Sequence, residues 1–189
     1  KRFSDPPVPR TPTQLAFVPP LMASTTAVKT FAAPSLPPSI FPQLTILGQA
    51  SADAQDLKAP ITSPELFTAD KAVRERQELH VLEVDGEVVG YAKTGFKDLW
   101  FYNPTDQKAG LQSHPSTPCL LDIFVFSQRS GLGRVLFSRV LESSGVEAGR
   151  WAYDRPSFRL PGFLRKGWGL EEGEKQSNGF MVFGEFFED

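Results

Sequence analysis

Residues 119–134 read CLLDIFVFSQRSGLGR, and this stretch decides the fold. From Leu120 to Phe126 every residue except Asp122 is apolar, and several are aromatic or β-branched, which predicts a strand buried on both faces. Gln128 to Gly133 then turns the chain, and apolar residues beyond it recur at helical spacing as far as Gly145. Backbone N–H groups at such a helix start, approached closely through two glycines, favour an anion such as pyrophosphate.

The Gln-x-x-Gly-x-Gly turn is by itself a weak signal, because glycine turns between strands and helices are common and most of them bind nothing. Its spacing differs from the dinucleotide fingerprint Gly-x-Gly-x-x-Gly, and no Gly-Lys-Ser/Thr is present, which disfavours nicotinamide and nucleoside triphosphate binding. From these residues alone, the turn is either an anion site or a purely structural turn.

The composition predicts one domain with a substantial core. The chain has 189 residues, of which 40% are hydrophobic and 12% aromatic, and its net charge of −2 provides no overall field for nucleic acid. Cys119 is the only cysteine, so no intrachain disulfide forms and a reducing compartment suits the chain. With only two histidines besides this cysteine, no metal site is expected. The sequence contains no run of 18 apolar residues, so it does not predict a membrane span.

Residues 1–42 differ in composition from the rest, since they hold ten of the seventeen prolines. We expect them to form an extended or disordered arm, followed by one folded domain at residues 43–189. The arm carries a net charge of +3, which suits either an acidic partner or a solvated tail. The first residue is Lys rather than Met, so we expect a fragment of a longer chain.

Beyond the arm, hydrophobic spacing and turn residues predict alternating groups of helices and strands. In order, the predicted elements are a helix at 44–57 ended by Pro60, a helix at 64–73 capped by Ser63, strands at 79–84, 87–94 and 99–102, the central strand, the helix after the glycine turn, a strand at 150–153, a helix beginning at 154–157 and a strand at 180–187. Asp85-Gly86 predicts a hairpin turn, and residues 103–118 are expected to be a mobile loop. The order predicts an α/β (α+β) fold, with a mixed, mostly antiparallel sheet flanked by helices.

Three separated blocks resemble the α-tubulin N-acetyltransferase family of the GNAT superfamily. They are residues 47–62 (LGQASADAQDLKAPIT), residues 118–122 (PCLLD) with 128–137 (QRSGLGRVLF), and residues 154–157 (DRPS). Weaker similarity at 90–97 and 178–187 extends the resemblance over roughly residues 44–187. The resemblance implies a GNAT-like fold, with the N-acetyltransferase catalytic domain at residues 43–189.

The function implied by this resemblance is acetyl transfer from acetyl-CoA to the side-chain amine of a lumenal-loop lysine of α-tubulin in microtubules. It further implies a cytoplasmic, cytoskeletal monomer, with a cilium or flagellum axoneme as one setting, and no nucleic acid, membrane or metal as partner. A lysine amine has a pKa of about 10.4, so the amine must lose a proton before it attacks the thioester. Once neutral, it attacks directly in a ternary complex, and no acyl-enzyme is required.

Three residues match the family's catalytic positions. Cys119 and Asp154 are each implied to be a base or a base relay, whereas the amide of Gln55 is no base and is implied to orient the lysine. Judged without the resemblance, a core cysteine, a helix-capping aspartate and a surface glutamine are the ordinary interpretations of these residues.

The resemblance also implies residues for both ligands. For acetyl-CoA these are Ile123, Phe124, Val125, Phe126, Ser127, Gln128, Arg129, Ser130, Gly131, Leu132, Gly133, Arg134, Ser157, Phe158, Arg159, Phe163 and Lys166. For tubulin they are Lys93, Phe96 and Lys97, which are otherwise a solvated strand edge. Pro161-Gly162 falls inside the last predicted helix, which we therefore expect to be kinked or split.

Three functions fit these observations. They are a tubulin lysine acetyltransferase, a GNAT enzyme acting on another protein lysine, and a non-catalytic microtubule-binding protein that has kept the fold.

Overall fold

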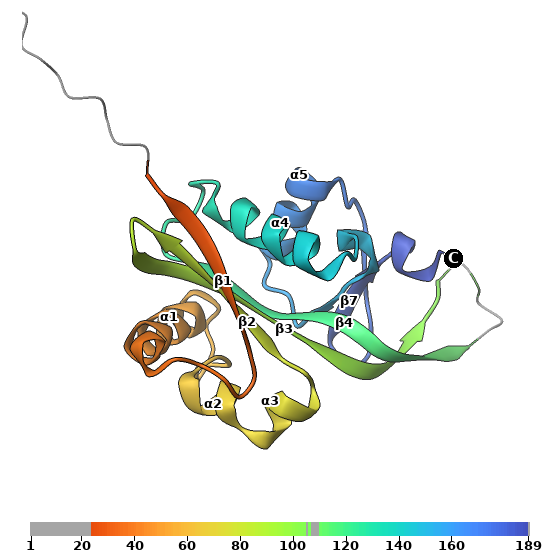
Figure 1. Ribbon diagram of the computed structural model, residues 1–189. Helices are drawn as coiled ribbons and strands as arrows, with labels where there is room; N and C mark the ends of the chain where they lie inside the picture. Colours follow the sequence, from red (N-terminus) through yellow and green to blue (C-terminus); the bar gives the residue numbers. More distant parts are fainter. Residues whose placement is uncertain (1–23, 105, 107–109, 189) are drawn as a thin grey trace, which may run out of the picture.

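The computed structural model describes residues 24–104, 106 and 110–188. In this part of the chain a seven-stranded sheet has the order β1-β2-β3-β4-β5-β7-β6, and every neighbouring pair is antiparallel except β4 and β5. The prediction of a mixed, mostly antiparallel sheet flanked by helices is confirmed. Helices α1, α2 and α3 cover one face of the sheet, and α4 and α5 cover the other (Figure 1).

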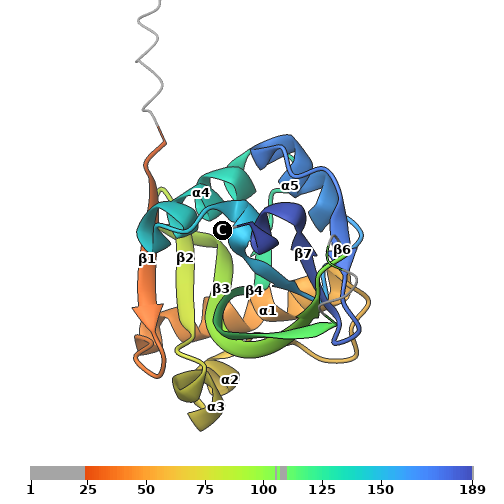
Figure 2. The same cartoon turned by 90° about the vertical axis from the view of Figure 1, so that its right-hand side faces the viewer.

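The strands are β1 (Thr26–Ala32), β2 (Glu78–Val84), β3 (Glu87–Tyr102), β4 (Leu111–Val125), β5 (Ala152–Asp154), β6 (Gly173–Lys175) and β7 (Phe180–Phe183). The α-helices are α1 (Phe41–Ala54), α2 (Pro64–Thr68), α3 (Asp70–Arg74), α4 (Leu132–Ser144) and α5 (Leu160–Trp168). Short 3-10 helices are η1 (Pro38–Ile40), η2 (Ala148–Arg150) and η3 (Gly184–Phe187). The view in Figure 2 shows the strands passing between the two helical layers.

Helices cover both faces of the sheet (Figure 1). Because consecutive strand residues point to opposite faces, neighbours along a strand belong to different cores. Leu82 and Ala92 pack with Phe137 in the core beneath α4 and α5. Their chain neighbours Val81 and Tyr91 belong instead to the core beneath α1 and α2. The predicted burial of the central strand on both faces is confirmed at Leu120 and Leu121, which belong to different core clusters, but Phe126 at its end is 50% exposed.

The N-terminal boundary differs from the sequence prediction. Residues 26–32 are not part of a disordered arm but form edge strand β1, which pairs with β2 along its whole length from Thr26↔Val84 to Ala32↔Glu78. Val28 and Phe31 pack against opposite cores, so this short β-branched and aromatic stretch behaves as a strand despite its proline-rich surroundings. The prolines at 34–38 occupy only the connection to α1. Residues 1–23 of the predicted arm lie outside the described residues.

Strands β3 and β4 are longer than predicted. Residues 99–102 continue β3 rather than forming a separate strand, and β4 begins at Leu111, so the expected loop at 103–118 is wrong for residues 111–118. The polar residues of this stretch pair with β3, as in Leu99↔His114. Their alternating exposure shows that one face of the hairpin is solvated, which explains the polar composition.

Helix α5 begins at Leu160, later than predicted, so Pro161 lies in its first turn, where the missing N–H is not needed. The expected kink at Pro161-Gly162 is therefore wrong. The helix predicted at 64–73 is divided into α2 and α3 at Ala69, whose backbone is extended, while the cap by Ser63 is confirmed. The final strand ends at Phe183 and is followed by η3, and β6 was not predicted.

Candidate active site

The glycine turn leads from β4 into helix α4, as predicted. Gly131 is the N-cap residue and has a left-handed backbone with φ 86°, a conformation that favours glycine. No side chain caps this helix start apart from a long 3.4 Å contact between Leu132 N and Ser130 Oγ. The first backbone N–H groups of α4 are therefore available to an anion.

Strands β4 and β5 separate beside this turn. They pair in parallel only at Cys119↔Ala152 and Leu120↔Tyr153, after which β5 ends and β4 continues to Val125. The backbone of residues 121–125 faces no strand on that side, whereas β3 pairs with it on the other. An extended amide-bearing chain such as pantetheine can hydrogen-bond to an open strand edge of this kind.

The two segments predicted to hold acetyl-CoA lie together. Arg159 Nη1 donates to Gln128 Oε1 over 2.7 Å, and a Cβ on Gly133 would lie 3.5 Å from the Phe163 ring. In the first segment Phe126, Ser127, Gln128, Arg129, Ser130, Gly131 and Arg134 are exposed, and Ile123, Phe124, Val125, Leu132 and Gly133 are partly buried. In the second, Phe158, Arg159 and Lys166 are exposed, and Ser157 and Phe163 are partly buried. Phe158 is 83% exposed, and the guanidinium of Arg159 lies over its ring, 5.2 Å from the centroid.

Asp154 stands at the end of β5, where the two strands part. Its Oδ1 accepts from Arg155 Nε over 2.9 Å, and its Oδ2 lies 3.9 Å from Lys97 Nζ. Its side chain is only 10% exposed. The alternative role as a helix cap does not apply, because α5 begins six residues later. Asp154 is thus a largely enclosed carboxylate between two cations.

Cys119 is fully buried on β4, next to β5. Its Sγ donates to the backbone oxygen of Thr117 over 3.2 Å. Burial raises the pKa of the Cys119 thiol to about 12, with Lys97 opposing the shift and Asp154 adding to it. The charges of Lys97 and Asp154 therefore both act on Cys119. At neutral pH this thiol remains protonated.

A buried polar network that the sequence did not predict surrounds Asp122. Its Oδ2 accepts from Tyr91 Oη and from Thr62 Oγ1 at 2.7 Å, and its Oδ1 accepts from Ser51 Oγ at 3.2 Å and from Gln55 Nε2 at 3.4 Å. Burial, and then the Asp122 charge, raises the pKa of Tyr91. A single carboxylate in an apolar strand was the one signal of this network in the sequence.

Gln55 is held by this network at the C-terminal end of α1. It is the C-cap residue of that helix, and its Nε2 also donates to Ser51 Oγ over 2.9 Å. The side chain is partly buried, so Gln55 is not the exposed helix glutamine of the alternative interpretation. Its orientation depends on Asp122 and Ser51.

The substrate-facing residues divide between the interior and the rim. Lys93 is only 7% exposed and donates to the backbone oxygen of Ile61, so it is not on a solvated strand edge, and its contact with tubulin stays a prediction. It lies opposite Asp122 in the β3–β4 register, and burial lowers the pKa of its amine to about 8. Phe96 is 37% exposed, and Lys97, whose side chain is 21% exposed, lies beside Asp154.

No group of three or more His, Cys, Asp or Glu side chains in the described part of the chain is arranged to hold a metal ion. Within residues 24–104, 106 and 110–188, no helix is long and apolar enough to cross a membrane.

Comparison with known proteins identifies the family. The family model described as "GNAT acetyltransferase, Mec-17" matches residues 19–189. Proteins named α-tubulin N-acetyltransferase are similar: one from Phytophthora infestans is 39% identical over 141 residues, covering 72% of this chain and 76% of its own length. One from Anopheles gambiae is 35% identical over 147 residues, covering 75% of this chain and 29% of its own length. α-Tubulin N-acetyltransferase 1 from Danio rerio is 39% identical over 165 residues, covering 80% and 52%.

Solved structures show the same fold at low sequence identity. An aminoglycoside N-acetyltransferase in complex with CoA has a TM-score of 0.53 at 15% identity, covering 82% of this chain and 93% of its own. The xEco2 acetyltransferase domain has a TM-score of 0.51 at 10% identity, covering 84% and 90%. The described sheet and helices therefore form the GNAT fold, and the chain belongs to the Mec-17 family of GNAT acetyltransferases.

Proposed function

We propose that this protein transfers an acetyl group from acetyl-CoA to the side-chain amine of a lumenal-loop lysine of α-tubulin in microtubules. The observation that carries the proposal is the position of Asp154, an enclosed carboxylate at the point where β4 and β5 separate. The uncapped N-terminus of α4 follows from the same strand β4. Relatives named α-tubulin N-acetyltransferase support the choice of acceptor.

The residues present fit acetyl-CoA. The open edge of β4 at residues 123–125 suits the amides of pantetheine, and the first N–H groups of α4 suit a pyrophosphate. The linked side chains of Gln128 and Arg159 border the same position, and Phe158 offers a face for the adenine. Bound acetyl-CoA supplies the acetyl group as a thioester. This chain supplies binding, orientation and a path for the proton.

Asp154 accepts the ammonium group of the incoming lysine, and the proton leaves through this carboxylate to water. Burial raises the pKa of the Cys119 thiol to about 12, so this thiol is protonated at pH 7.5. It is therefore a buried neighbour of the reaction rather than its base. The ammonium first gives up one proton. As the neutral amine attacks, the N–C bond forms, the S–C bond breaks, and a second proton passes from the nitrogen to the departing CoA thiolate, which leaves as the free thiol.

Gln55 positions the lysine rather than exchanging protons. Its amide is fixed by Ser51 and by the buried carboxylate of Asp122, so its orientation is set before substrate arrives. Phe96 and Lys97 lie at the rim and meet the tubulin loop, where a cation suits an acidic protein. We place this activity in the cytoplasm on the cytoskeleton, in a monomer whose catalytic domain includes residues 43–189.

The test is transfer of radiolabelled acetyl from acetyl-CoA to polymerised tubulin by the purified protein. Label in α-tubulin, strongly reduced by Asp154→Asn, is the expected result. Label that appears in histone peptides but not in tubulin would assign the enzyme to another protein lysine. Binding to microtubules without CoA release would identify a non-catalytic protein that has kept the fold.

A further inference from the structure

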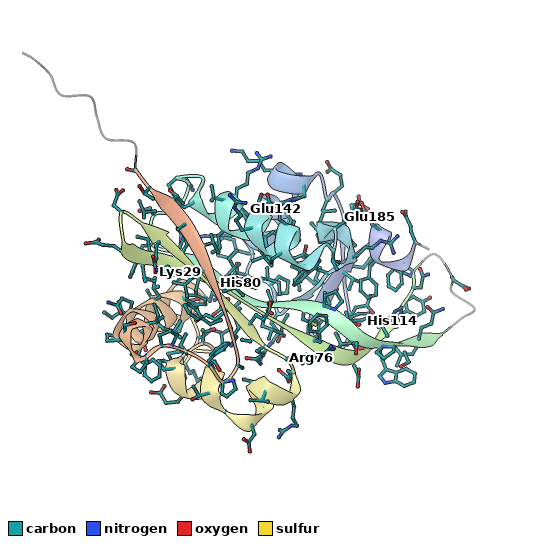
Figure 3. The ribbon with its side chains drawn as sticks, in the orientation of Figure 1. Lys29, Arg76, His80, His114, Glu142 and Glu185 are labelled. Carbon is teal, nitrogen blue, oxygen red and sulfur yellow. The ribbon has the colours of Figure 1, made fainter. Side chains whose placement is uncertain are left out.

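A second carboxylate, Glu75, lies beside Lys97, with its Oε1 3.6 Å from Lys97 Nζ. Glu75 is the C-cap residue of α3, and its backbone oxygen accepts from Phe96 N over 2.7 Å. A Cβ on Gly95 would lie only 3.1 Å from the same oxygen, so glycine allows this turn to approach β3 closely. Arg76 follows and stacks 4.2 Å above the Phe96 ring, near α3 in Figure 3. The backbone thus holds Glu75 against the strand that carries Lys97.

The side chain of Glu75 is also held in place. Its Oε2 accepts from Nε2 of the buried Gln77 over 2.7 Å. Its other oxygen, Oε1, lies 3.6 Å from Lys97 Nζ and 3.8 Å from Nζ of the exposed Lys71. Glu75 is only 18% exposed, so water screens its interaction with Lys97 only in part. Because Gln77 holds Oε2, the other oxygen of Glu75, Oε1, faces Lys97 and Lys71.

Lys97 is shared between two carboxylates. Its Nζ lies 3.6 Å from Glu75 Oε1 and 3.9 Å from Asp154 Oδ2, and both distances exceed that of a direct charged hydrogen bond. The other groups that face Asp154 are Arg155 from the following loop, Lys93 from β3 and Cys119 from β4. Arg155 already pairs with Asp154, since its Nε donates to Oδ1 over 2.9 Å and its Nη2 donates to Oδ2 over 3.4 Å, whereas Lys97 stands between Asp154 and Glu75.

We propose that Glu75 is a positioning residue that holds Lys97 away from Asp154 Oδ2, so that this oxygen, whose hydrogen bond from Arg155 Nη2 is a long 3.4 Å, can receive the ammonium group of an incoming lysine. A second ammonium group at the same carboxylate oxygen is disfavoured, because the two cations repel each other at short range. Without Glu75, Lys97 moves onto Asp154, and the substrate must displace it. This inference rests on the proposed function, since it takes a substrate lysine as the ligand of Asp154.

The first test is Glu75→Gln, in which the new amide oxygen still accepts from Gln77 but the charge is lost. We expect the Kd of a peptide carrying the α-tubulin lumenal-loop lysine to rise about tenfold, which is about 1.4 kcal/mol, by calorimetry in the presence of CoA. The same peptide with acetyl-lysine has no charge and should bind Glu75→Gln and wild type equally. Glu78→Gln, at a neighbouring acidic position, is the control and should leave both Kd values unchanged.

A double-mutant cycle separates positioning of Lys97 from a general loss of structure. In the Lys97→Met background, Glu75→Gln should change the Kd of the lysine peptide by less than about twofold, because no ammonium is left to move. A crystal structure of Glu75→Gln should show Lys97 Nζ within hydrogen-bonding distance of Asp154 Oδ2. Equal losses for the lysine and acetyl-lysine peptides, or the same loss in the Lys97→Met background, would overturn the inference.

The outcomes distinguish this inference from the proposed function. If the wild-type protein neither binds nor acetylates the lysine peptide, the proposed function fails, while the Lys97 position in Glu75→Gln still tests the positioning role. If wild type acetylates the peptide and Lys97 stays in place in Glu75→Gln, the proposed function stands and the role of Glu75 is refuted.

Discussion

Asp122→Asn tests the buried network that holds Gln55. The aspartate accepts four hydrogen bonds, two on each oxygen, from donors on α1, the α1–α2 connection and β3. Asparagine has nearly the same shape but only one acceptor oxygen. Two donors therefore lose their acceptor, and the remaining two hydrogen bonds lose the assistance of the negative charge. The buried Lys93 also loses the anion that lies opposite it.

The expected cost follows from these contacts. Each weakened or lost buried hydrogen bond costs about 1 kcal/mol, so four donors give a loss of about 2–4 kcal/mol in the free energy of unfolding, with rotation of the hydroxyl groups limiting the damage. For a domain of this size the melting temperature should fall by roughly 4–16 °C. Removal of the Asp122 charge should also lower the pKa of Lys93 further below about 8, because Asp122 raises it against the effect of burial.

The assay is urea unfolding at pH 7.5, together with the initial rate of tubulin acetylation below the melting temperature. Asp53→Asn is the matched control, because Asp53 lies on the same helix and contacts Gln49 at the surface, so its loss should cost less than about 0.5 kcal/mol. Both folded Asp122→Asn and Gln55→Ala should acetylate tubulin more slowly than wild type, because each change removes the fixed orientation of the Gln55 amide. Equal unfolding midpoints for Asp122→Asn and Asp53→Asn would refute the reasoning.

Three further predictions follow from the site and from the edge of the sheet. At pH 7.5, Asp154→Asn should lower the acetylation rate about 10²-fold, whereas Cys119→Ala should lower it less than about tenfold. A larger effect of Cys119→Ala would identify the thiol as the base. Gly131→Val should weaken acetyl-CoA binding at least tenfold in calorimetry, because the left-handed N-cap is lost; unchanged affinity of the folded variant would remove the pyrophosphate from this turn. Burial lowers the pKa of His80 to about 4 from 6.5, so the unfolded chain binds more protons in that window. The contribution of His80 to stability should therefore be constant above pH 6.5 and fall by up to about 3 kcal/mol towards pH 4. His80→Gln, whose side chain can still bond Thr30 and Thr94, should flatten this dependence in acid titrations of unfolding, and an equally steep loss in the variant would exclude His80 as its source.

Local patterns predicted the central strand and the helix start. The apolar run before Gln128 and the two glycines after it act over a few residues, so the strand, turn and helix could be predicted from the sequence. Asp85-Gly86 likewise predicted the hairpin between β2 and β3, since this dipeptide adopts the turn with little help from distant residues. The strand predicted at 150–153 is close to β5, which ends one residue later at Asp154, whereas the helix predicted from 154–157 begins only at Leu160.

Contacts distant in sequence escaped prediction. Asp122 draws its partners from residues 31 to 71 positions away, and no local pattern reveals them. A lysine on a strand is ordinarily expected to be exposed, but Lys93 is buried on β3, opposite Asp122 on the adjacent strand β4. Strand β1 was missed because the prolines around it dominate the composition, whereas its hydrogen bonds come from β2, more than 45 residues along the chain.

The most direct test of the proposed function is site-resolved acetylation of polymerised tubulin. The purified protein is incubated with acetyl-CoA and microtubules, and acetyl-lysine positions are mapped by mass spectrometry for wild type and Asp154→Asn. We predict acetylation of one lumenal-loop lysine of α-tubulin by wild type and about 10²-fold less by Asp154→Asn. Equal acetylation by the two proteins, or no acetylation of α-tubulin by wild type, would contradict the assignment.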